Sequence, residues 1–455
     1  MIFQSALFQF KIVFIDNENY FLYNFNMNEN SWVSKWSRDQ IKAMLLEQFQ
    51  SFWKTETGIL REQLREVERA ATSPHAVIIS GLRRAGKSTL LAQMAHNLGE
   101  EAFYYLNFED DRLLNFQADD INDLYQSLLE IFGERKIFML DEIQNIAGWE
   151  HFVRRFMDMG FKFYITGSNA LLLSRELGTR LTGRYIAIEL FPFSFKEYLR
   201  FREIPLPPLD RMTTVDLAQL QKNLVEYSQS GGVPDALKYP ELAILRTLYN
   251  DVLYRDIATR YRLGNVAMLK ELGFFLMSNI ANLISYNKLK QQFNVGSVNT
   301  IKTYIEYMQD SWLFFTLNVH DYSVKRQQIA AKKIYSIDTG LSRSVGFQFS
   351  PNTGRVLENL VFLALRQKNQ EVYYLTTPNG YEVDFYLPEK GQLIQVSQHL
   401  ENSTTREREI RALQDALAHT PAQTALILAN ANQDGFEING IPVSIRSTAE
   451  WLLQE

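Results

Sequence analysis

Residues 81–89 read Gly-Leu-Arg-Arg-Ala-Gly-Lys-Ser-Thr, and no other stretch constrains the fold of this chain as strongly. They fit the pattern G-x-x-x-x-G-K-[ST]. The apolar run at 76–80 before them is typical of a buried strand, and the amphipathic segment 88–94 after them is typical of a helix. In that context glycines let consecutive backbone N–H groups turn inward, and the start of the helix adds partial positive charge. The sequence therefore predicts a phosphate-binding loop.

Each residue type in this loop has an expected role, with ATP and Mg²⁺ as the expected ligands. Lys87 would reach the β- and γ-phosphates, and the Ser88 hydroxyl would hold Mg²⁺. The rest of the loop would surround the phosphates with backbone and side-chain groups from Gly81, Arg83, Arg84, Ala85, Gly86 and Thr89.

Length and composition limit the remaining possibilities. At 455 residues the chain is too long for one core, so several domains are expected. The net charge of −5 provides no global basic field, so any nucleic-acid contact must come from a local patch. The absence of cysteine excludes disulfides and thiol chemistry and is compatible with a cytoplasmic location. We expect no membrane span and no signal peptide, and the strand-like start of the chain suggests an added hairpin or an upstream extension.

Strand-like and helix-like segments alternate after the loop. Strands are expected at 103–108, 136–140 and 163–166, with helices at 119–132 and 149–159 between them. This alternation predicts a parallel sheet covered by helices on both faces. Ligands of such sheets bind at the carboxyl ends of the strands, which is where the polar motifs lie.

The strand at 136–140 is followed by two carboxylates. Asp141 would hold the water shell of Mg²⁺, and Glu142 would polarise the attacking water as general base. The next strand also ends in polar residues that can lie between the γ-phosphate and the water. Asn169 and Ser168 are the candidates there, with Thr166 as a third.

Arg175, Arg180 and Arg184 follow this strand. A guanidinium can neutralise charge on the transferred phosphoryl group, often from a neighbouring subunit, which would require a homo-oligomer. We favour Arg184, then Arg180, as this catalytic arginine. The competing interpretation for each of them is an ordinary surface ion pair.

The second half of the chain predicts further domains. Residues 193–261 have a mostly helical pattern, and a helix-turn-helix pattern at 284–308 precedes two strands, which is typical of a winged helix. Residues 354–428 alternate again between helix and strand and predict a second α/β unit.

Together these motifs resemble the prokaryotic AAA-type ATPases that join a P-loop core to a helical lid, a winged helix and a C-terminal PD-(D/E)xK-like domain of unknown function. The resemblance extends from about residue 55 to the C-terminus and rests on segments 81–89, 140–144, 166–169, 181–184, 190–195, 231–234 and 253–257. It implies an α/β fold with ATP binding and hydrolysis. The implied domains are an N-terminal extension (1–54), an ATPase core with a parallel sheet (55–190), a helical lid (191–262), a winged helix (263–340) and a restriction-endonuclease-like α/β domain (341–455).

The resemblance also suggests roles for two further features. In related signalling ATPases a Gly-x-Pro in the lid touches the adenine, and Pro234 occupies that position here. The Arg83-Arg84 pair matches the family as well. These arginines would contact phosphate, a neighbouring subunit, or only the acidic cluster at 109–111.

In the C-terminal domain, Glu358, Asp384 and Gln395 stand where a PD-(D/E)xK nuclease has its acids and glutamine. Such acids bind Mg²⁺, and a lysine positions water. Ser397 stands where that lysine belongs, and a hydroxyl cannot supply its charge. We therefore expect a retained fold that serves as an interaction module for a protein partner. A displaced basic residue, such as Lys390 or Arg406, would be needed for cleavage.

The expected winged helix carries a limited basic surface. Its second helix has one basic residue, Lys302, and the following wing region holds Lys325, Arg326, Lys332 and Lys333. These side chains would grip DNA phosphates rather than read bases. Winged helices also serve as protein-interaction modules, so both alternatives remain.

Three functions follow from these features. The first is an ATP-hydrolysing switch or motor that assembles through its arginines and acts on DNA. The second is an ATP-regulated, metal-dependent nuclease that uses Glu358 and Asp384. The third is a signalling scaffold gated by ATP exchange. The Asp141-Glu142 pair favours turnover, and Ser397 disfavours the nuclease.

Overall fold

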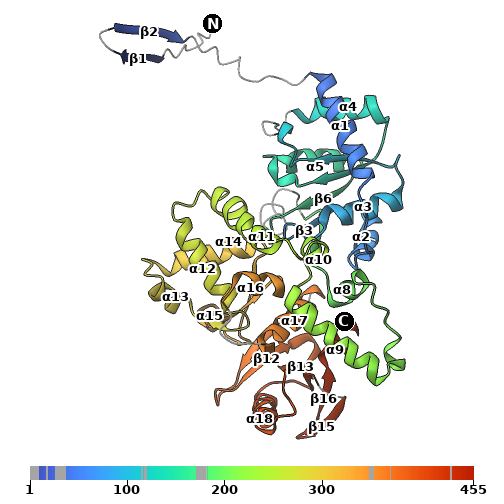
Figure 1. Cartoon of the computed structure of the whole chain (residues 1–455), viewed down its shortest axis with the longest axis vertical. Coiled ribbons are helices and arrows are strands. Elements are labelled where there is room, and N and C mark those ends of the chain that lie inside the picture. Colours follow the sequence, from blue (N-terminus) through green and yellow to red (C-terminus); the bar gives the residue numbers. More distant parts are fainter. Residues whose placement is uncertain are drawn as a thin grey trace.

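A computed structural model describes residues 10–16, 19–25, 37–113, 116, 120–170, 181, 183–347, 353–368, 370–430 and 433–454. Figure 1 shows the domain with the predicted phosphate loop, called the core below, at one end, the C-terminal sheet at the other, and a mainly helical domain beside them. The first described strands, β1 (Phe10–Asp16) and β2 (Asn19–Phe25), pair antiparallel as a hairpin. Within the described residues, no helix combines the length and the apolar character needed to cross a bilayer.

The core is built on a sheet of five parallel strands in the order β4-β5-β6-β3-β7. The strands are β3 (Ala76–Gly81), β4 (Phe103–Asn107), β5 (Ile137–Asp141), β6 (Lys162–Gly167) and β7 (Tyr185–Leu190). Four of them are predicted by the sequence. The fifth, β7, is an edge strand that the sequence pattern did not reveal.

Helices cover both faces of this sheet because its strands are apolar on both sides. Along β3, Ile78 joins one buried cluster, while Val77 and Ile79 join the other. The helices of the core are α1 (Arg38–Trp53), α2 (Leu64–Ala71), α3 (Lys87–Leu98), α4 (Ile121–Phe132) and α5 (Trp149–Asp158). The parallel sheet between two helical layers confirms the predicted α/β class.

Helix α1 lies within the stretch predicted as an extension, and it packs on the core. Its Gln48 is buried, accepts a hydrogen bond from the backbone N–H of Asn107 at 2.9 Å and donates to the carbonyl of the same residue at 3.1 Å. Gln48 thereby provides hydrogen-bond partners for the backbone N–H and carbonyl groups of Asn107, at the carboxyl end of β4.

Residues 191–262, which the sequence suggested as a lid and which are called the lid below, are mainly helical. It contains α8 (Phe195–Phe201), α9 (Thr214–Ser230), α10 (Pro234–Lys238), α11 (Ile244–Asp251) and a π-helix, η5 (Val252–Thr259). The π-helix is a rare element in proteins, and where it occurs it is often part of a functional site.

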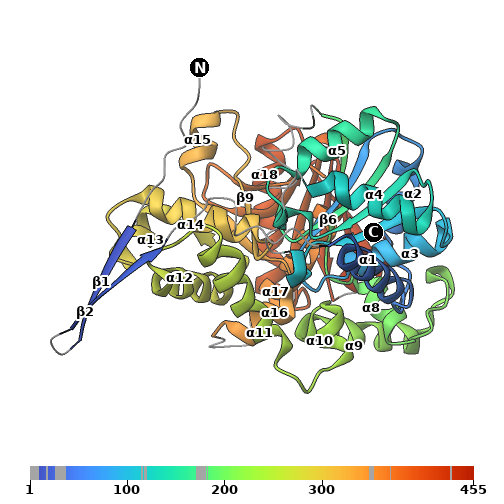
Figure 2. The same ribbon diagram turned by 90° about the horizontal axis from the view of Figure 1, so that it is seen from above.

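The middle domain (residues 263–340) contains α12 (Val266–Ser278), α13 (Tyr286–Gln292), α14 (Val298–Asp310) and α15 (Val324–Ile329). Its antiparallel sheet has the order β8-β10-β9, with β8 at Leu283–Ile284, β9 at Phe314–Leu317 and β10 at Lys332–Ser336. In Figure 2, α12–α14 and the core helices α2–α5 lie on opposite sides of the molecule.

The C-terminal domain (residues 341–455) begins within α16 (Thr339–Val345) and contains α17 (Thr353–Gln367), α18 (Ser403–His419) and α19 (Thr448–Gln454). Its six-stranded sheet has the order β11-β12-β13-β14-β16-β15. The strands are β11 (Tyr373–Thr376), β12 (Glu382–Leu387), β13 (Gln392–Ser397), β14 (Thr424–Ala429), β15 (Asp434–Ile438) and β16 (Ile441–Ser447). The last two strands are not predicted by the sequence.

The three domains beyond the core share one interior. A single apolar cluster of buried side chains includes Tyr227 of the lid, Phe314 of the middle domain and Phe362 of the C-terminal domain. Because this interior is continuous, displacement of one of these domains disturbs the packing of the others.

Candidate nucleotide site

The loop between β3 and α3 has the curled backbone that the sequence predicts. A Cβ atom at Gly81 would lie 2.0 Å from the carbonyl oxygen of Leu190 on β7, so only glycine fits there. Gly86 has φ of 93°, in the left-handed region that disfavours side chains, and helix α3 begins directly after it at Lys87. Steric limits therefore explain why both of these motif positions are glycine.

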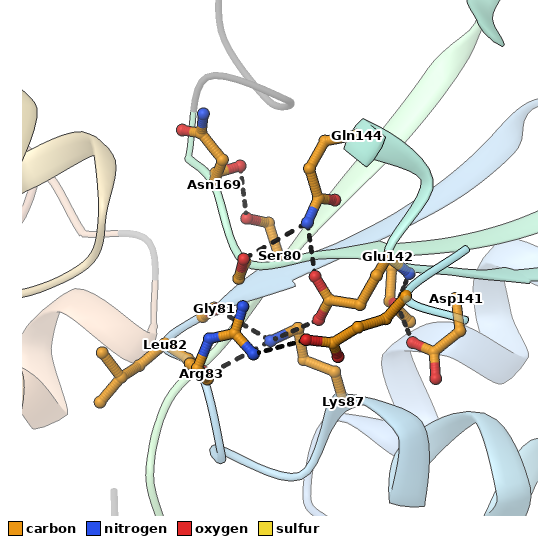
Figure 3. A network of polar contacts seen from close by, with 12 residues as sticks. Ser80, Gly81, Leu82, Arg83, Lys87, Asp141, Glu142, Gln144 and Asn169 are labelled. Atoms are coloured by element: carbon orange, nitrogen blue, oxygen red, sulfur yellow. Dashed lines mark hydrogen bonds and ion pairs between the residues drawn. The ribbon is translucent and has the colours of Figure 1, made fainter. Parts of the chain in front are cut away.

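Lys87 is buried at the base of the loop. Its Nζ donates to the carbonyl oxygens of Gly81 and Leu82, each at 3.3 Å, and lies 3.4 Å from Oε1 of Glu142 (Figure 3). The loop lysine and the predicted general base are thus adjacent. Of the remaining loop residues, Ala85 is buried, while Ser88 and Thr89 occupy the first turn of α3.

Asp141 ends β5 and is buried. Its carboxylate accepts hydrogen bonds from the hydroxyls of Ser88, Thr166 and Tyr105, the last at 3.2 Å. Burial, together with the adjacent charge of Glu142, raises the pKa of Asp141 in spite of these bonds. The Ser88 hydroxyl and the Asp141 carboxylate form an oxygen donor pair of the kind that Mg²⁺ prefers.

Glu142 stands directly after the strand in a strained conformation, with φ of 52°. Its backbone N–H donates to the Thr166 hydroxyl at 3.1 Å, and its carboxylate accepts a hydrogen bond from Gln144. Burial opposes ionisation of this carboxyl, but the charge of Lys87 and the Gln144 bond outweigh burial, so the net pKa is lowered. Glu142 is therefore ionised at neutral pH.

The end of β6 closes the site on another side. The Ser168 hydroxyl accepts a hydrogen bond from Gln144 at 3.3 Å, which links it indirectly to Glu142. Asn169 is buried, and its carbonyl oxygen accepts from the Ser80 hydroxyl at 2.9 Å. That hydroxyl in turn accepts from the indole N–H of Trp312, in the middle domain, at 3.0 Å. Ser168 thus contacts the residue that binds Glu142, whereas Asn169 is joined to the end of β3 through its backbone carbonyl oxygen.

Arg83 contacts acids, in line with one of the three alternatives for the arginine pair. Its guanidinium lies 2.9 Å from Glu109 and 3.4 Å from Asp256 of η5. Burial lowers the pKa of this guanidinium, but the two carboxylates raise it by more, so the net pKa is raised. Asp256 lies in the 253–257 motif without having been singled out as a site residue.

Arg84 and Pro234 are near neighbours in space. Arg84 lies 3.9 Å from the carboxylate of Asp235, and Pro234 is the first residue of α10. The residue after Pro234 therefore lies near the phosphate loop, and contact of Pro234 with the base stays a prediction.

Arg184 lies away from the site of its own chain. It immediately precedes β7, its carbonyl oxygen accepts from the N–H of Ala76 at the start of β3, and its side chain pairs with Asp158 at 2.7 Å. The parallel register places this position at the amino ends of the strands, opposite the loop. Arg175 and Arg180 lie outside the described residues.

Arg61 supports the loop from behind and was not found from the sequence. Its buried guanidinium pairs with Glu197 at 2.9 Å and donates to the carbonyl oxygens of Ala85 and Phe191, each at 2.7 Å. Arg61 occurs in no sequence motif, and its partner Glu197 lies 136 residues away. No local signal could have paired them.

The C-terminal acids also come together. Glu358 of α17 and Asp384 of β12 are joined by Lys333 of β10, whose Nζ lies 2.8 Å and 2.9 Å from them. Gln395 donates to Glu409 at 2.6 Å and accepts from the N–H of Asp384 at 3.3 Å.

The prediction that Lys333 contacts DNA phosphates is wrong, because this lysine is 1% exposed. Lys332 is half-buried and is bound to Asn318 and to the carbonyl oxygen of Gln327. Arg406 pairs with Asp434 at 3.6 Å, and Lys390 is exposed in a turn of the C-terminal domain. Neither of these two supplies the charge that Ser397 lacks.

Residues 73–199 match the AAA domain family. Two domains of unknown function match residues 221–352 and 353–447. With the loop geometry described above, the AAA match defines the core as an AAA-type P-loop ATPase domain.

An uncharacterized protein of Methanocaldococcus jannaschii is 37% identical over 387 residues, covering 82% of this chain and 86% of that protein. The chain belongs to the family of this archaeal protein. An uncharacterized protein of Haemophilus influenzae is 28% identical over 396 residues, covering 83% of this chain and 94% of that protein.

Solved structures give weaker similarities. A Walker-type ATPase of Pyrococcus abyssi has a TM-score of 0.40 at 13% identity, covering 65% of this chain and 99% of that chain. The ORC1 protein of Aeropyrum pernix, solved in complex with DNA, has a TM-score of 0.32 at 12% identity, covering 66% and 96%. Similarities at this level carry no argument about function.

Proposed function

We propose that this protein binds and hydrolyses ATP at the loop site and acts as a nucleotide-driven switch or motor. The observation that carries the proposal is the convergence of three elements. Lys87 at the start of α3, the Ser88–Asp141 pair and Glu142 after β5 lie together, and Lys87 is 3.4 Å from Glu142. These are the groups needed to hold phosphates, a metal ion and an attacking water.

The roles follow from the chemistry of each group. Mg²⁺ bound by Ser88 and Asp141 would neutralise charge on the phosphate oxygens. Lys87 would exchange its contact with Glu142 for the γ-phosphate, leaving the carboxylate free to accept a proton from water. Gln144 and Ser168 would keep Glu142 oriented, because Gln144 donates to both. Glu142 is suited to this task since its lowered pKa keeps it ionised.

Two contacts support a switch, because each connects the site to a different domain. Arg83 of the loop binds Asp256 of the π-helix that ends the lid. Next to the polar end of β6, the backbone N–H of Ala170 donates to the carbonyl oxygen of Asp310 at 2.7 Å, at the end of α14. A change in the occupancy of the loop would therefore act on the lid and on the middle domain at once.

Steady-state ATP hydrolysis of two variants tests the proposal. Lys87→Ala should lose ATP binding, and Glu142→Gln should bind ATP but hydrolyse it ~10²–10⁴-fold more slowly. The matched controls are Lys136→Ala and Glu134→Gln, which form an exposed ion pair just before the amino end of the same strand, β5. Normal hydrolysis by Glu142→Gln would remove this residue from the chemistry, and unchanged ATP affinity of Lys87→Ala would refute the loop assignment.

We further propose that Arg184 acts on the site of a neighbouring copy. Arg184 lies at the amino ends of the strands, away from the loop of its own chain, so a contact with phosphate would have to be made in another copy. The ion pair with Asp158 is the competing role. Mixing Arg184→Ala with Lys87→Ala protein should restore hydrolysis, because one intact site would then form between the two chains. No recovery at any mixing ratio would exclude a shared site.

DNA association is proposed through the basic residues of the middle domain that remain on its surface, Lys302, Lys325 and Arg326. Arg326 has a side chain that is 79% exposed. Stimulation of hydrolysis by duplex DNA, lost when these three are replaced by glutamine, tests this role. Absence of any DNA effect would favour the alternative, a scaffold that binds protein partners.

A further inference from the structure

Lys333 is the most unusual charged residue of the described chain. It belongs to β10 of the middle domain, but its ammonium group lies inside the C-terminal domain. Its Nζ contacts three carboxylates, at 2.8 Å from Glu358, 2.7 Å from Glu382 and 2.9 Å from Asp384. The side chain is 1% exposed. The contacts with Glu358 and Asp384 are hydrogen bonds donated by the ammonium group, and the contact with Glu382 is an ion pair.

The carboxylates are held in turn by the C-terminal domain and by β10. The Tyr335 hydroxyl donates to Glu358 at 2.7 Å, and the backbone N–H of Val396 donates to Asp384 at 2.9 Å. Burial opposes the charge on Lys333, but the surrounding carboxylates outweigh it and raise its pKa well above the usual value. One lysine therefore faces three carboxylates, of which Glu358 and Asp384 are buried, and this lysine belongs to another domain.

The position of this cation matters because Glu358 and Asp384 are the acids that would hold a metal ion. Within the described residues no group of three or more acidic, histidine or cysteine side chains is arranged to hold a metal. Two oxygens of these acids already bind the Lys333 ammonium group at 2.8–2.9 Å. A divalent cation would compete with that charge for the same oxygens.

We propose that Lys333 is the built-in cation of the C-terminal carboxylate site, where it replaces a divalent metal and pins the middle domain to the C-terminal domain. This inference is independent of ATP hydrolysis, since none of its residues contacts the nucleotide site. While the pin is in place the acids are not available for metal-dependent cleavage. The C-terminal domain is then a docking element that responds to the position of β10.

Lys333→Met tests the pin, with Lys332→Met as its matched control on the same strand. Lys332 binds Asn318 and the carbonyl oxygen of Gln327 within the middle domain instead of the acids. In Lys333→Met the buried carboxylates lose their cation, so amide exchange in β10 and β12 should accelerate by more than about a hundredfold. Lys332→Met should leave exchange in β12 unchanged. Wild-type exchange rates in Lys333→Met would overturn the proposal.

Calorimetric titration with Mn²⁺ alone tests the replacement of a metal. It is performed without nucleotide and in the Asp141→Asn background, which removes the metal contact of the nucleotide site. Protein that retains Lys333 should take up no Mn²⁺, whereas Lys333→Met should gain one site, and a further Asp384→Asn change should remove it. Two results would overturn the proposal. Protein that retains Lys333 would bind Mn²⁺ and lose this binding in Asp384→Asn, or it would nick plasmid DNA and lose this activity in Asp384→Asn.

A neutral variant keeps the test decisive if Lys333→Met does not fold. Replacing Lys333 by Met together with Glu358→Gln, Glu382→Gln and Asp384→Asn removes all charges at once. Because replacing a complete buried ion cluster is often tolerated while removing one partner is not, this variant should fold. Its failure to fold would show that charge compensation is not what Lys333 supplies.

Discussion

Replacement of Arg61 by methionine should weaken both the core and the phosphate loop. Arg61 and Glu197 form an ion pair of 2.9 Å in which both side chains are at most 2% exposed. Removing one partner of such a pair costs about 3–5 kcal/mol, because the other charge stays buried. Glu197 would keep hydrogen bonds from the N–H groups of Glu62 at 2.8 Å and Ser194 at 3.0 Å. We therefore expect the lower end of that range, about 3 kcal/mol.

The loop would be affected because Ala85 would lose the donor to its carbonyl oxygen, at 2.7 Å, immediately before Gly86 and Lys87. We expect ATP affinity to fall by about tenfold, as for one lost charge-assisted hydrogen bond. Arg61→Lys should recover little of the lost stability and ATP affinity. The planar guanidinium of Arg61 donates to three separate acceptors, and a single ammonium group cannot reach all of them.

Amide exchange of β3 and α3 is the suitable stability assay, because a chain of several domains does not unfold in one step. Calorimetry supplies the ATP affinity. The double variant with Glu197→Gln should be more stable than Arg61→Met alone, because the uncompensated carboxylate is removed. Wild-type exchange and wild-type ATP affinity in Arg61→Met would refute the reasoning.

Three further outcomes are expected. Gln144→Ala should lower the rate of ATP hydrolysis about tenfold at unchanged ATP affinity, because Glu142 loses the hydrogen bond that orients it. Equal losses of hydrolysis rate and ATP affinity would contradict this role. Arg83→Gln and Asp256→Asn should each uncouple ATP binding from amide exchange in the lid, and their combination should do no further harm. Hydrogen bonds from Arg112 hold the pKa of Asp110 at about 2, so its contribution is present above pH 4 and is lost as pH falls toward 2. Asp110→Asn should remove about 1 kcal/mol of this pH-dependent stability, allowing for solvent screening. Amide exchange in β4 at pH 5 and pH 2.5, corrected for the intrinsic exchange rate at each pH, measures this loss.

The four strands of the core sheet that the sequence predicts are almost completely buried. All six residues of β3 are buried, so an apolar run identified it. In β7 only Ile188 and Leu190 are buried, because β7 lies at the edge of the sheet and covers less of the core. The same reason applies to β15, which is mostly exposed at the edge of the C-terminal sheet. Edge position alone does not decide this, because β4 lies at the other edge of the core sheet and was predicted. Four of its five residues are buried, and helix α1 packs against it.

The parts of the site that could be predicted are those encoded locally. Gly86, Lys87 and Ser88 are defined by spacing alone, and Asp141 and Glu142 by their place after an apolar strand. Contacts made across the fold leave no local signal. The indole of Trp312 reaches the hydroxyl of Ser80 over 232 residues, and Arg61 reaches Glu197 over 136.

Lys333 shows how a local pattern can mislead. In the sequence it belongs to a basic wing with Lys325 and Arg326, which suggested an exposed phosphate contact. Side chains alternate along a strand, so Lys332 and Lys333 point to opposite faces of β10. Whether each lysine is exposed depends on what packs against its face of the strand. For Lys333 this is the acid cluster around Glu358.

The contacts of Trp312 and Lys333 form a continuous route from the phosphate loop to the C-terminal domain. Trp312 binds Ser80 next to the loop and lies just before β9, and β9 pairs with β10 with Leu317 opposite Lys333. Lys333 then binds the acids of α17 and β12. A displacement at the end of β3 would thus move β9, β10 and the pin as one unit, provided the indole contact holds.

Trp312→Phe tests this route because it removes the indole N–H while it keeps an aromatic ring in the interior. We expect ATP to change amide exchange in β12 of the wild-type protein and to have no such effect in Trp312→Phe or in Lys333→Met. The double variant should behave as either single variant does, since both lie on one path. An ATP effect on β12 that survives in Trp312→Phe would show that the coupling runs through the lid, where Arg83 meets Asp256, instead.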